Sequence, residues 1–372
     1  MERPEILNWL RETDGRRLEA LWRQADAVRR EQVGDAVHLR GLIEISSFCV
    51  RQCGYCGIRA GRVGLDRYRM TPDEILDCAR SAARFGYGTV VVQAGEDPQL
   101  TPEWVAGVVR RIKAECPLAV TLSLGEQDEA TLRAWKEAGA DRYLLRFETS
   151  NPRLFASIHP PRTGRSIDRI SQLHSLRELG YEVGSGVMIG IPGQTYDDLA
   201  DDVELFRTLD LDMIGVGPFL PHPETPLGQL QEEGTKARRH EGTEGDGEQV
   251  PNTELMTYKV VALARLVCPC ANIPSTTALA TLNRESGREL GLVRGANIIM
   301  PNLTPPEYRA RYEIYPAKAC LYETAEQCHH CIRGRIVALG RTVGTGHGGS
   351  PNWRARVAGD QEPAPGGDHK ET

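Results

Sequence analysis

Residues 46–70, SSFCVRQCGYCGIRAGRVGLDRYRM, decide the fold of this chain. They carry three cysteines, Cys49, Cys53 and Cys56, in C-x3-C-x2-C spacing, with Tyr55 directly before the last. Three thiolates on one short loop can hold three irons of a [4Fe–4S] cluster and leave the fourth iron open to a small molecule. A tetrahedral zinc site needs a fourth ligand, and no His or Cys follows nearby. The spacing therefore favours an iron–sulfur site.

A predicted strand leads directly into this loop. The run 42–46 is mainly apolar, so the cysteines follow the C-terminal end of a strand, where barrel enzymes place their active sites. Strand-like and helical patterns then alternate. The predicted strands are 42–46, 89–94, 119–124, 142–147, 183–191, 212–218, 272–278 and 297–301. The predicted helices between them are 72–85, 101–115, 127–138, 167–179, 196–209, 253–268 and 284–291. This succession predicts a (β/α)8 TIM barrel of the α/β class.

The regions outside the barrel differ in composition. Residues 1–35 are predicted to form N-terminal helices, and the barrel is expected over 36–305. Residues 229–251 are charged and Gly-rich with few apolar side chains, which favours a flexible insertion, with a functional lid as the alternative. A C-terminal extension follows over 306–354, and the polar stretch 355–372 is expected to be disordered.

The composition excludes several classes of protein. The 372 residues carry a net charge of −6, which argues against electrostatic binding of nucleic acid or acidic membranes. No apolar run reaches the roughly 18 residues of a membrane span, and the N-terminus is too charged for a signal peptide. Ten cysteines without a leader indicate metal-bound thiolates in a reducing compartment. We therefore expect a cytoplasmic protein with no nucleic-acid or membrane partner.

Glycine-rich segments follow two of the predicted strands. The segment QAGED at 93–97 contains Gly95, which allows the backbone to approach a ligand closely; a simple strand-to-helix turn is the alternative. The segment GIPGQT at 190–195 has the same character, and Pro218 ends the sixth predicted strand. Backbone groups at such strand ends can bind a zwitterionic ligand.

The fourth predicted strand carries two arginines. Arg142 and Arg146 are four residues apart, so they share one face of a strand. Two guanidinium groups inside a barrel are costly to bury without an anion. Either an anionic substrate or an internal carboxylate such as Glu148 must pair with them, and the sequence leaves both options open.

A second group of cysteines lies near the C-terminus. Cys320, Cys328 and Cys331 follow Cys-x7-Cys-x2-Cys spacing, with His329 and His330 between the last two. A zinc site with a histidine ligand and a second iron–sulfur cluster both fit this spacing.

These motifs together resemble a known family. The first cysteine group is similar to that of the radical S-adenosylmethionine (SAM) superfamily. The segments RYLLRFETSNP, GIPGQTYDDLADDV, DMIGVGPFLPHPETPL, GANIIMPNLTPPEYR and IYPAKAC, with the second cysteine group, resemble the HydE maturases of [FeFe]-hydrogenase over about residues 40–350. Biotin synthases and methylornithine synthases, which are related, lack that second group.

The resemblance implies an enzyme that cleaves SAM reductively to a 5′-deoxyadenosyl radical. It implies that the radical serves to assemble the diiron subcluster of the hydrogenase H-cluster. The implied substrate is a small organometallic compound, a cysteine-bound iron carbonyl cyanide complex, delivered by a partner maturase. The implied electron donor is a ferredoxin or flavodoxin. The second cysteine group would then hold a further [4Fe–4S] or [2Fe–2S] cluster.

The resemblance also assigns roles to individual residues. Cys49, Cys53 and Cys56 would hold the cluster, and Arg169 the SAM carboxylate. The other expected SAM contacts are Tyr55, Gln93, Gly95, Glu148 and Pro218. The expected substrate contacts are Thr121, Arg142, Arg146, Thr276, Thr277, Met300 and Tyr315. Two departures from the family pattern are Ala94, where serine is frequent, and the length of the insertion at 229–251.

Two other functions compete with this interpretation. One is a radical SAM mutase or sulfur-insertion enzyme that acts on a small organic substrate. The other is an iron–sulfur scaffold or electron carrier without catalysis. Glycine-rich strand ends and arginines inside the barrel count against a carrier, since a carrier needs no SAM pocket.

Overall fold

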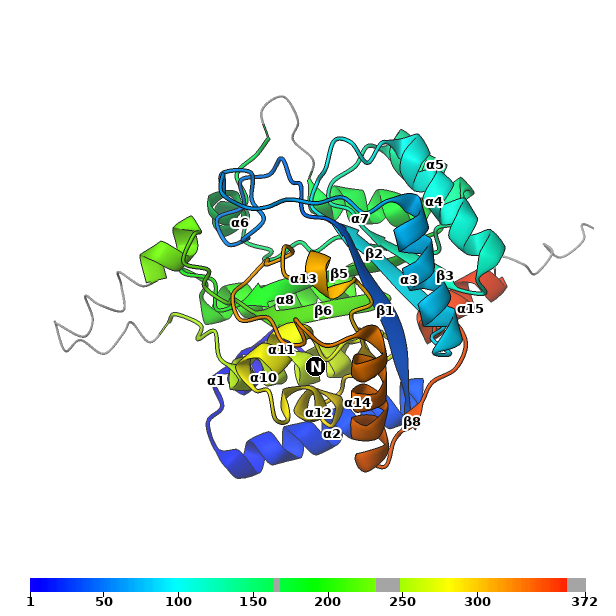
Figure 1. Ribbon diagram of the computed structural model, residues 1–372. Coiled ribbons are helices and arrows are strands. Elements are labelled where there is room, and N and C mark those ends of the chain that lie inside the picture. The colour runs from blue at the N-terminus through cyan, green and yellow to red at the C-terminus, as the bar shows by residue number, and fades with distance from the viewer. Residues whose placement is uncertain (163–167, 232–247, 360–372) are drawn as a thin grey trace, which may run out of the picture.

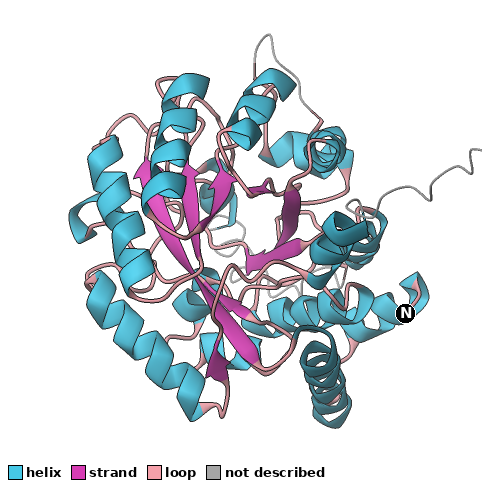
Figure 2. Cartoon of the chain, turned by 90° about the vertical axis from the view of Figure 1, so that its right-hand side faces the viewer, coloured by secondary structure: helices cyan, strands magenta, loops and turns pink. Residues whose placement is uncertain are grey.

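The barrel is built from parallel strands that follow one another around a ring. The computed structural model describes residues 1–162, 168–231 and 248–359. The strands are β1 (Ala36–Ser46), β2 (Thr89–Ala94), β3 (Ala119–Ser123), β4 (Arg142–Leu144), β5 (Glu182–Ile189), β6 (Met213–Pro218) and β7 (Ile298–Ile299). Their order in the sheet is β6-β5-β4-β3-β2-β1-β7. Helices surround the strands on the outside (Figure 1, Figure 2).

The ring closes between β6 and β7 through residues 272–274, which form isolated bridges instead of a strand. Asn272 is bridged to Met213 of β6, and Pro274 to Ile298 of β7, both in parallel. Proline has no N–H to donate to a ladder, which accounts for the short pairing of the seventh predicted strand. The prediction of a TIM-type barrel is confirmed.

Helices follow the strands, and the longer ones lie at the predicted positions. The longer ones are α3 (Pro72–Arg84), α4 (Pro102–Glu115), α5 (Glu129–Glu137), α7 (Arg169–Glu178), α8 (Tyr196–Thr208) and α10 (Glu254–Val267). The shorter ones are α6 (Pro152–Ile158), α11 (Thr277–Leu282), α12 (Gly287–Leu292) and α13 (Pro306–Arg309). Thr71 and Glu74 begin α3 with reciprocal side-chain to backbone hydrogen bonds, which satisfy two of the unpaired N–H groups of the first turn.

Two N-terminal helices cover the outside of the barrel. They are α1 (Arg3–Arg11) and α2 (Gly15–Val33), and they pack against α8 and α10. Arg3 forms ion pairs with Asp197 and Asp201 of α8. Lys259 of α10 donates a hydrogen bond to the Leu10 carbonyl oxygen at 2.8 Å. No helix within the described ranges is both long and apolar enough to cross a membrane.

The C-terminal extension is more ordered than the sequence suggested. It contains α14 (Ala325–Ala338), β8 (Thr342–Val343) and α15 (Pro351–Gly359). Since α15 runs to Gly359, the expectation of disorder from residue 355 is wrong for its first five residues, and 360–372 lie outside the described residues. Most of the expected insertion, 232–247, also lies outside them. Its far edge is described, and there Val250 is buried.

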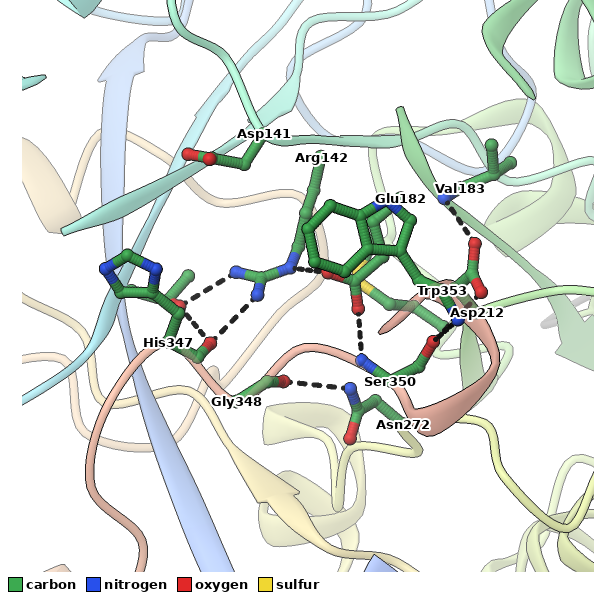
Figure 3. Close-up of polar contacts among 12 residues, drawn as sticks. Asp141, Arg142, Glu182, Val183, Asp212, Asn272, His347, Gly348, Ser350 and Trp353 are labelled. Atoms are coloured by element: carbon green, nitrogen blue, oxygen red, sulfur yellow. Dashed lines mark hydrogen bonds and ion pairs between the residues drawn. The ribbon is translucent and has the colours of Figure 1, made fainter. Parts of the chain in front are cut away.

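Residues 344–353, which we call the floor segment, close the N-terminal end of the barrel (Figure 3). They follow β8, which pairs with the first two residues of β1. The carbonyl oxygen of His347 accepts from Arg142 Nη2 and Thr89 Oγ1, each at 2.9 Å. The N–H of Ser350 donates to Glu182 Oε1 at 2.8 Å. The floor segment is therefore tied to β2, β4 and β5 at once.

Candidate active site

One cavity of about 360 Å³ reaches from the cysteine loop down into the barrel, where Arg40 and Met213 line its lower part. All but one of the residues predicted to bind the first cluster, SAM or substrate line it. They are Cys49, Cys53, Tyr55, Cys56, Gln93, Gly95, Thr121, Arg146, Glu148, Arg169, Pro218, Thr276, Thr277, Met300 and Tyr315.

The cysteine loop is held in place by backbone hydrogen bonds. The N–H groups of Val50, Gly54 and Gly57 donate to carbonyl oxygens just after β2, at the end of α6 and in the C-terminal extension, at 3.0, 2.7 and 2.9 Å. A Cβ atom on Gly95 would lie 2.3 Å from the Phe48 carbonyl oxygen. Only glycine therefore lets the end of β2 approach the loop this closely.

The donor set of this loop fits a [4Fe–4S] cluster. All three thiols are free and line the same cavity. Burial raises the pKa of each thiol, that of Cys53 to about 12, so a bound metal is needed to stabilise the thiolates. Among the described residues no three His, Cys, Asp or Glu side chains stand close enough for a single metal ion. A four-iron cluster instead takes its thiolates at separate corners.

A buried charged group, the Glu126 cluster, lies against the cysteine loop. It consists of Arg51, Glu126, His159 and Arg169. Glu126 Oε1 accepts from Arg169 Nε at 2.9 Å, and Oε2 accepts from Arg51 Nη1 at 3.1 Å. Burial alone would raise the pKa of Glu126, but His159 and the two arginines lower it to about 2. His159 Nδ1 lies 3.0 Å from Cys53 Sγ. The sequence analysis missed Glu126 and His159, since neither stands in a recognised motif.

Arg146 faces the cavity and is paired within the protein. Its Nη2 lies 2.8 Å from Glu148 Oε2 and donates to the Val187 carbonyl oxygen at 2.6 Å. Its Nε is buried without a hydrogen-bond partner, and Glu148 Oε2 meets the ion-pair distance without hydrogen-bond geometry. Arg146 thus pairs with an internal carboxylate and still has a donor for a ligand.

Arg142 does not line this cavity, so its predicted contact with substrate is wrong. It is 1% exposed at the floor of the barrel, where its Nε pairs with Glu182 and Nη1 donates to Thr89 Oγ1 at 2.9 Å. It borders a separate cavity of about 390 Å³ beside the floor segment. The two arginines do share the inside of the barrel, but Arg142 begins β4, whereas Arg146 lies beyond its end, beside the cavity.

A second buried ion pair in the cavity was also missed. Lys318 Nζ contacts Glu44 Oε1, and Glu44 Oε2 accepts from Asn302 Nδ2 at 2.9 Å. Both charged side chains line the cavity. Lys318 also lies 5.3 Å from the ring centroid of Tyr312. A glutamate inside the apolar strand sequence LIEIS was the available indication, since buried charges are rare unless paired.

The second cysteine group is only partly assembled. Cys320 and Cys328 share a hydrogen bond, which lowers the pKa of the Cys320 thiol, and Arg288 lies beside Cys320. Cys331 is exposed one turn further along α14. His329 stacks on Phe85 at a centroid distance of 4.6 Å. The His329 ring therefore packs against the side chain of Phe85.

Comparisons with known proteins identify the family of this chain. The model of the radical SAM superfamily matches residues 43–206. The [FeFe] hydrogenase maturase subunit HydE of Thermotoga maritima is 46% identical over 331 residues, covering 89% of this chain and 88% of that protein. The 3-methylornithine synthase of Methanosarcina barkeri is 30% identical over 291 residues, covering 77% and 75%. The crystal structure of methylornithine synthase (PylB) superposes with a TM-score of 0.76 at 26% identity, covering 96% of both chains. The chain therefore belongs to the radical SAM superfamily and, within it, to the HydE family of [FeFe]-hydrogenase maturases.

Proposed function

We propose that this radical SAM enzyme binds its cluster through Cys49, Cys53 and Cys56 and acts on a cysteine-bound iron carbonyl cyanide precursor of the hydrogenase diiron subcluster. The observation that carries the proposal is that the three thiols line one cavity together with the residues expected to bind SAM. Delivery of the precursor by a partner maturase, reduction by a ferredoxin or flavodoxin, and a cytoplasmic location belong to the same proposal.

The upper part of the cavity is suited to SAM. When bound, the cluster supplies the electron that cleaves a sulfur–carbon bond of SAM. Arg169 has five N–H groups, of which three contact Glu126, Arg146 O and His159. The two others can donate to the SAM carboxylate. Tyr55 and the backbone at Gly95 border the same space.

The lower part of the cavity offers partners to a polar, anionic substrate. Buried polar atoms without a hydrogen-bond partner point to where such a substrate is bound, because an unsatisfied buried donor is costly. Among those of residues that line this cavity are Arg40 Nε, Thr121 Oγ1, Arg146 Nε and Thr276 Oγ1. Enclosure by the barrel holds the substrate against the radical and excludes water.

The first test concerns SAM cleavage. The variant Cys53→Ala, reconstituted without oxygen, is expected to lose 5′-deoxyadenosine formation because only two thiolates are left to hold the cluster. Cys270→Ala is the matched control, since Cys270 is half-buried and contacts Gln32 far from the cavity. Unchanged deoxyadenosine formation by Cys53→Ala would contradict the cluster assignment.

The second test concerns the substrate. We expect an apo-hydrogenase supplied with the other maturases to evolve hydrogen only when this protein is added. If deoxyadenosine forms but no hydrogenase activity follows, the enzyme acts on a small organic substrate, as the 30% identity to a 3-methylornithine synthase would favour.

We also propose that Cys320, Cys328 and Cys331 hold a second iron–sulfur cluster that is dispensable for SAM cleavage. The contact between Cys320 and Cys328 supports this proposal, and none of the three lines the main cavity. The triple Ala variant should contain less iron and still form deoxyadenosine. Loss of deoxyadenosine formation in a folded variant would show instead that the two sites depend on each other.

A further inference from the structure

The ring of His159 lies between a proposed cluster ligand and two arginines. His159 is 3% exposed, at the end of α6. Its Nδ1 lies 3.0 Å from Cys53 Sγ. Its Nε2 contacts the Nη2 atoms of Arg51 and Arg169, the latter at 2.8 Å. The preceding residue accepts the N–H of Gly54 at 2.7 Å, so the ring and the cysteine loop are held together.

The neighbours of Nε2 do not by themselves fix where the ring carries its proton. The two guanidinium groups can only donate to Nε2, whereas Glu126 Oε1, which lies 3.0 Å from the same atom, can only accept from it. The contact on the other side of the ring decides the matter, because a thiolate sulfur beside Nδ1 can only accept a hydrogen bond. A cluster held by Cys53 therefore requires a proton on Nδ1.

We propose that His159 donates an Nδ1–H hydrogen bond to the Cys53 sulfur and thereby raises the reduction potential of the cluster. A metal-bound thiolate has no proton and can only accept, so the 3.0 Å contact is compatible with this direction alone. A donor stabilises negative charge on the sulfur, and the reduced cluster carries more negative charge than the oxidised one. Hydrogen bonds to sulfur are among the factors that set the potential of such clusters.

Within this arrangement Glu126 has a positioning role. It holds Arg51 and Arg169 through separate carboxylate oxygens, and its Oε1 lies 3.0 Å from His159 Nε2, so it keeps the ring in its orientation. The ring itself packs against Phe155 at a centroid distance of 5.0 Å. The inference rests on the proposed cluster ligands and adds a residue that adjusts their chemistry.

The test is a redox titration of the reconstituted full-length protein, followed by EPR without SAM. The variant His159→Leu removes the donor and should lower the midpoint potential. His159→Asn, whose amide nitrogen can occupy the place of Nδ1, should restore much of it. His222→Asn is the matched control. His222 is also buried, but its Nε2 lies 3.4 Å from Glu313 and its Nδ1 accepts from the Glu224 N–H, so the potential should not change.

A second measurement decides the matter if the Leu variant fails to hold iron. In protein labelled with 15N-histidine, pulsed EPR of the reduced cluster should show a nitrogen coupling that disappears in His159→Asn and persists in His222→Asn. The inference is overturned if the Leu variant has full iron content and the parent potential, or if the labelled parent shows no coupling. Loss of iron from Cys53→Ala tests the proposed ligands separately.

Discussion

Arg142 and Arg146 show how a separation of four residues changes the role of the same residue type. Arg142 is buried with Glu182 as its carboxylate partner and the floor segment as an acceptor. Arg146 has a third of its side chain exposed and an unpartnered Nε in the cavity. The first is expected to stabilise the fold and the second to bind a ligand.

The substitutions Arg142→Met and Arg146→Met form a matched pair. Arg142→Met leaves Glu182 buried without its partner, which costs about 3–5 kcal/mol, so the thermal midpoint should fall strongly. Arg146→Met should lower the midpoint less, because a third of the Arg146 side chain is exposed, whereas both partners of the Arg142–Glu182 pair are fully buried. It should retain deoxyadenosine formation but lose hydrogenase maturation. Calorimetry and the two activity assays measure these effects.

The opposite results would contradict the roles assigned to Arg142 and Arg146. If Arg146→Met matures hydrogenase fully, Arg146 serves only as the structural partner of Glu148. If Arg142→Met is as stable as the parent protein, the contacts with Glu182 and the floor segment contribute less than their burial indicates.

At the scale of elements, the loop after β5 is fixed by a buried pair of side chains. Gln194 Oε1 accepts from the Gly190 N–H at 2.7 Å, and its Nε2 donates to Asp202 Oδ2 at 3.3 Å. Asp202, on α8, also accepts from the Ser150 N–H at 2.5 Å. The GIPGQT segment is therefore held by α8 as well as by its own turn.

Asp202 predicts a pH dependence of stability. Burial, which outweighs its hydrogen bonds, raises the pKa of Asp202 from 3.8 to about 7. Since the folded state holds this proton more tightly, the group stabilises the fold below about pH 4, and that contribution is lost as the pH rises through about 7. The thermal midpoint of Asp202→Asn should fall less between pH 4 and pH 8 than that of the parent. Equal slopes for the two proteins would show that Asp202 is ionised throughout.

Local patterns predicted most of the elements, and long-range contacts account for what was missed. Strand β4 ends at Leu144 instead of residue 147 because the Ser185 hydroxyl accepts the Phe147 N–H and donates to the Leu145 carbonyl oxygen. Helix α14 was not predicted, although Cys328, Ile332 and Ile336 have helical spacing and are buried.

In the candidate site, too, local sequence patterns did not predict contacts between residues far apart in the chain. The cysteine spacing indicated the proposed cluster loop because its residues are close together in sequence. The contact of Cys53 with His159 spans 106 positions, and that of Glu44 with Lys318 spans 274. No single segment contains either pair. Arg142 was placed on the correct side of its strand, but periodicity does not give its height in the barrel.

At the scale of the whole molecule, the C-terminal part of the chain packs against the first strand of the barrel. The floor segment follows β8, and β8 pairs with the first residues of β1, where the barrel begins. Ser350 Oγ donates to Asp212 Oδ1 at 2.9 Å, and Asn272 Nδ2 to the Gly348 carbonyl oxygen at 3.0 Å. The last described part of the chain thus connects strands from both halves of the barrel.

Gly88, directly before β2, leaves room for the floor segment to lie against it. A Cβ atom on Gly88 would lie 1.6 Å from the Gly346 carbonyl oxygen, whereas one on Gly107 of α4 meets nothing within 4 Å. Gly88→Ala should therefore displace the floor segment, lower the thermal midpoint and increase hydrogen exchange over 344–350. Gly107→Ala should match or slightly exceed the parent midpoint, since alanine favours a helix. Unaltered exchange in Gly88→Ala would mean that the segment adapts without detaching.

Closure of the barrel by the floor segment leads us to expect an ordered binding sequence. If SAM is held at Arg169 as proposed, a substrate bound near Arg40, in the lower part of the cavity, would have to enter before SAM and leave after the products of SAM cleavage. Excess SAM should consequently inhibit turnover at low substrate concentration, and a higher substrate concentration should relieve that inhibition.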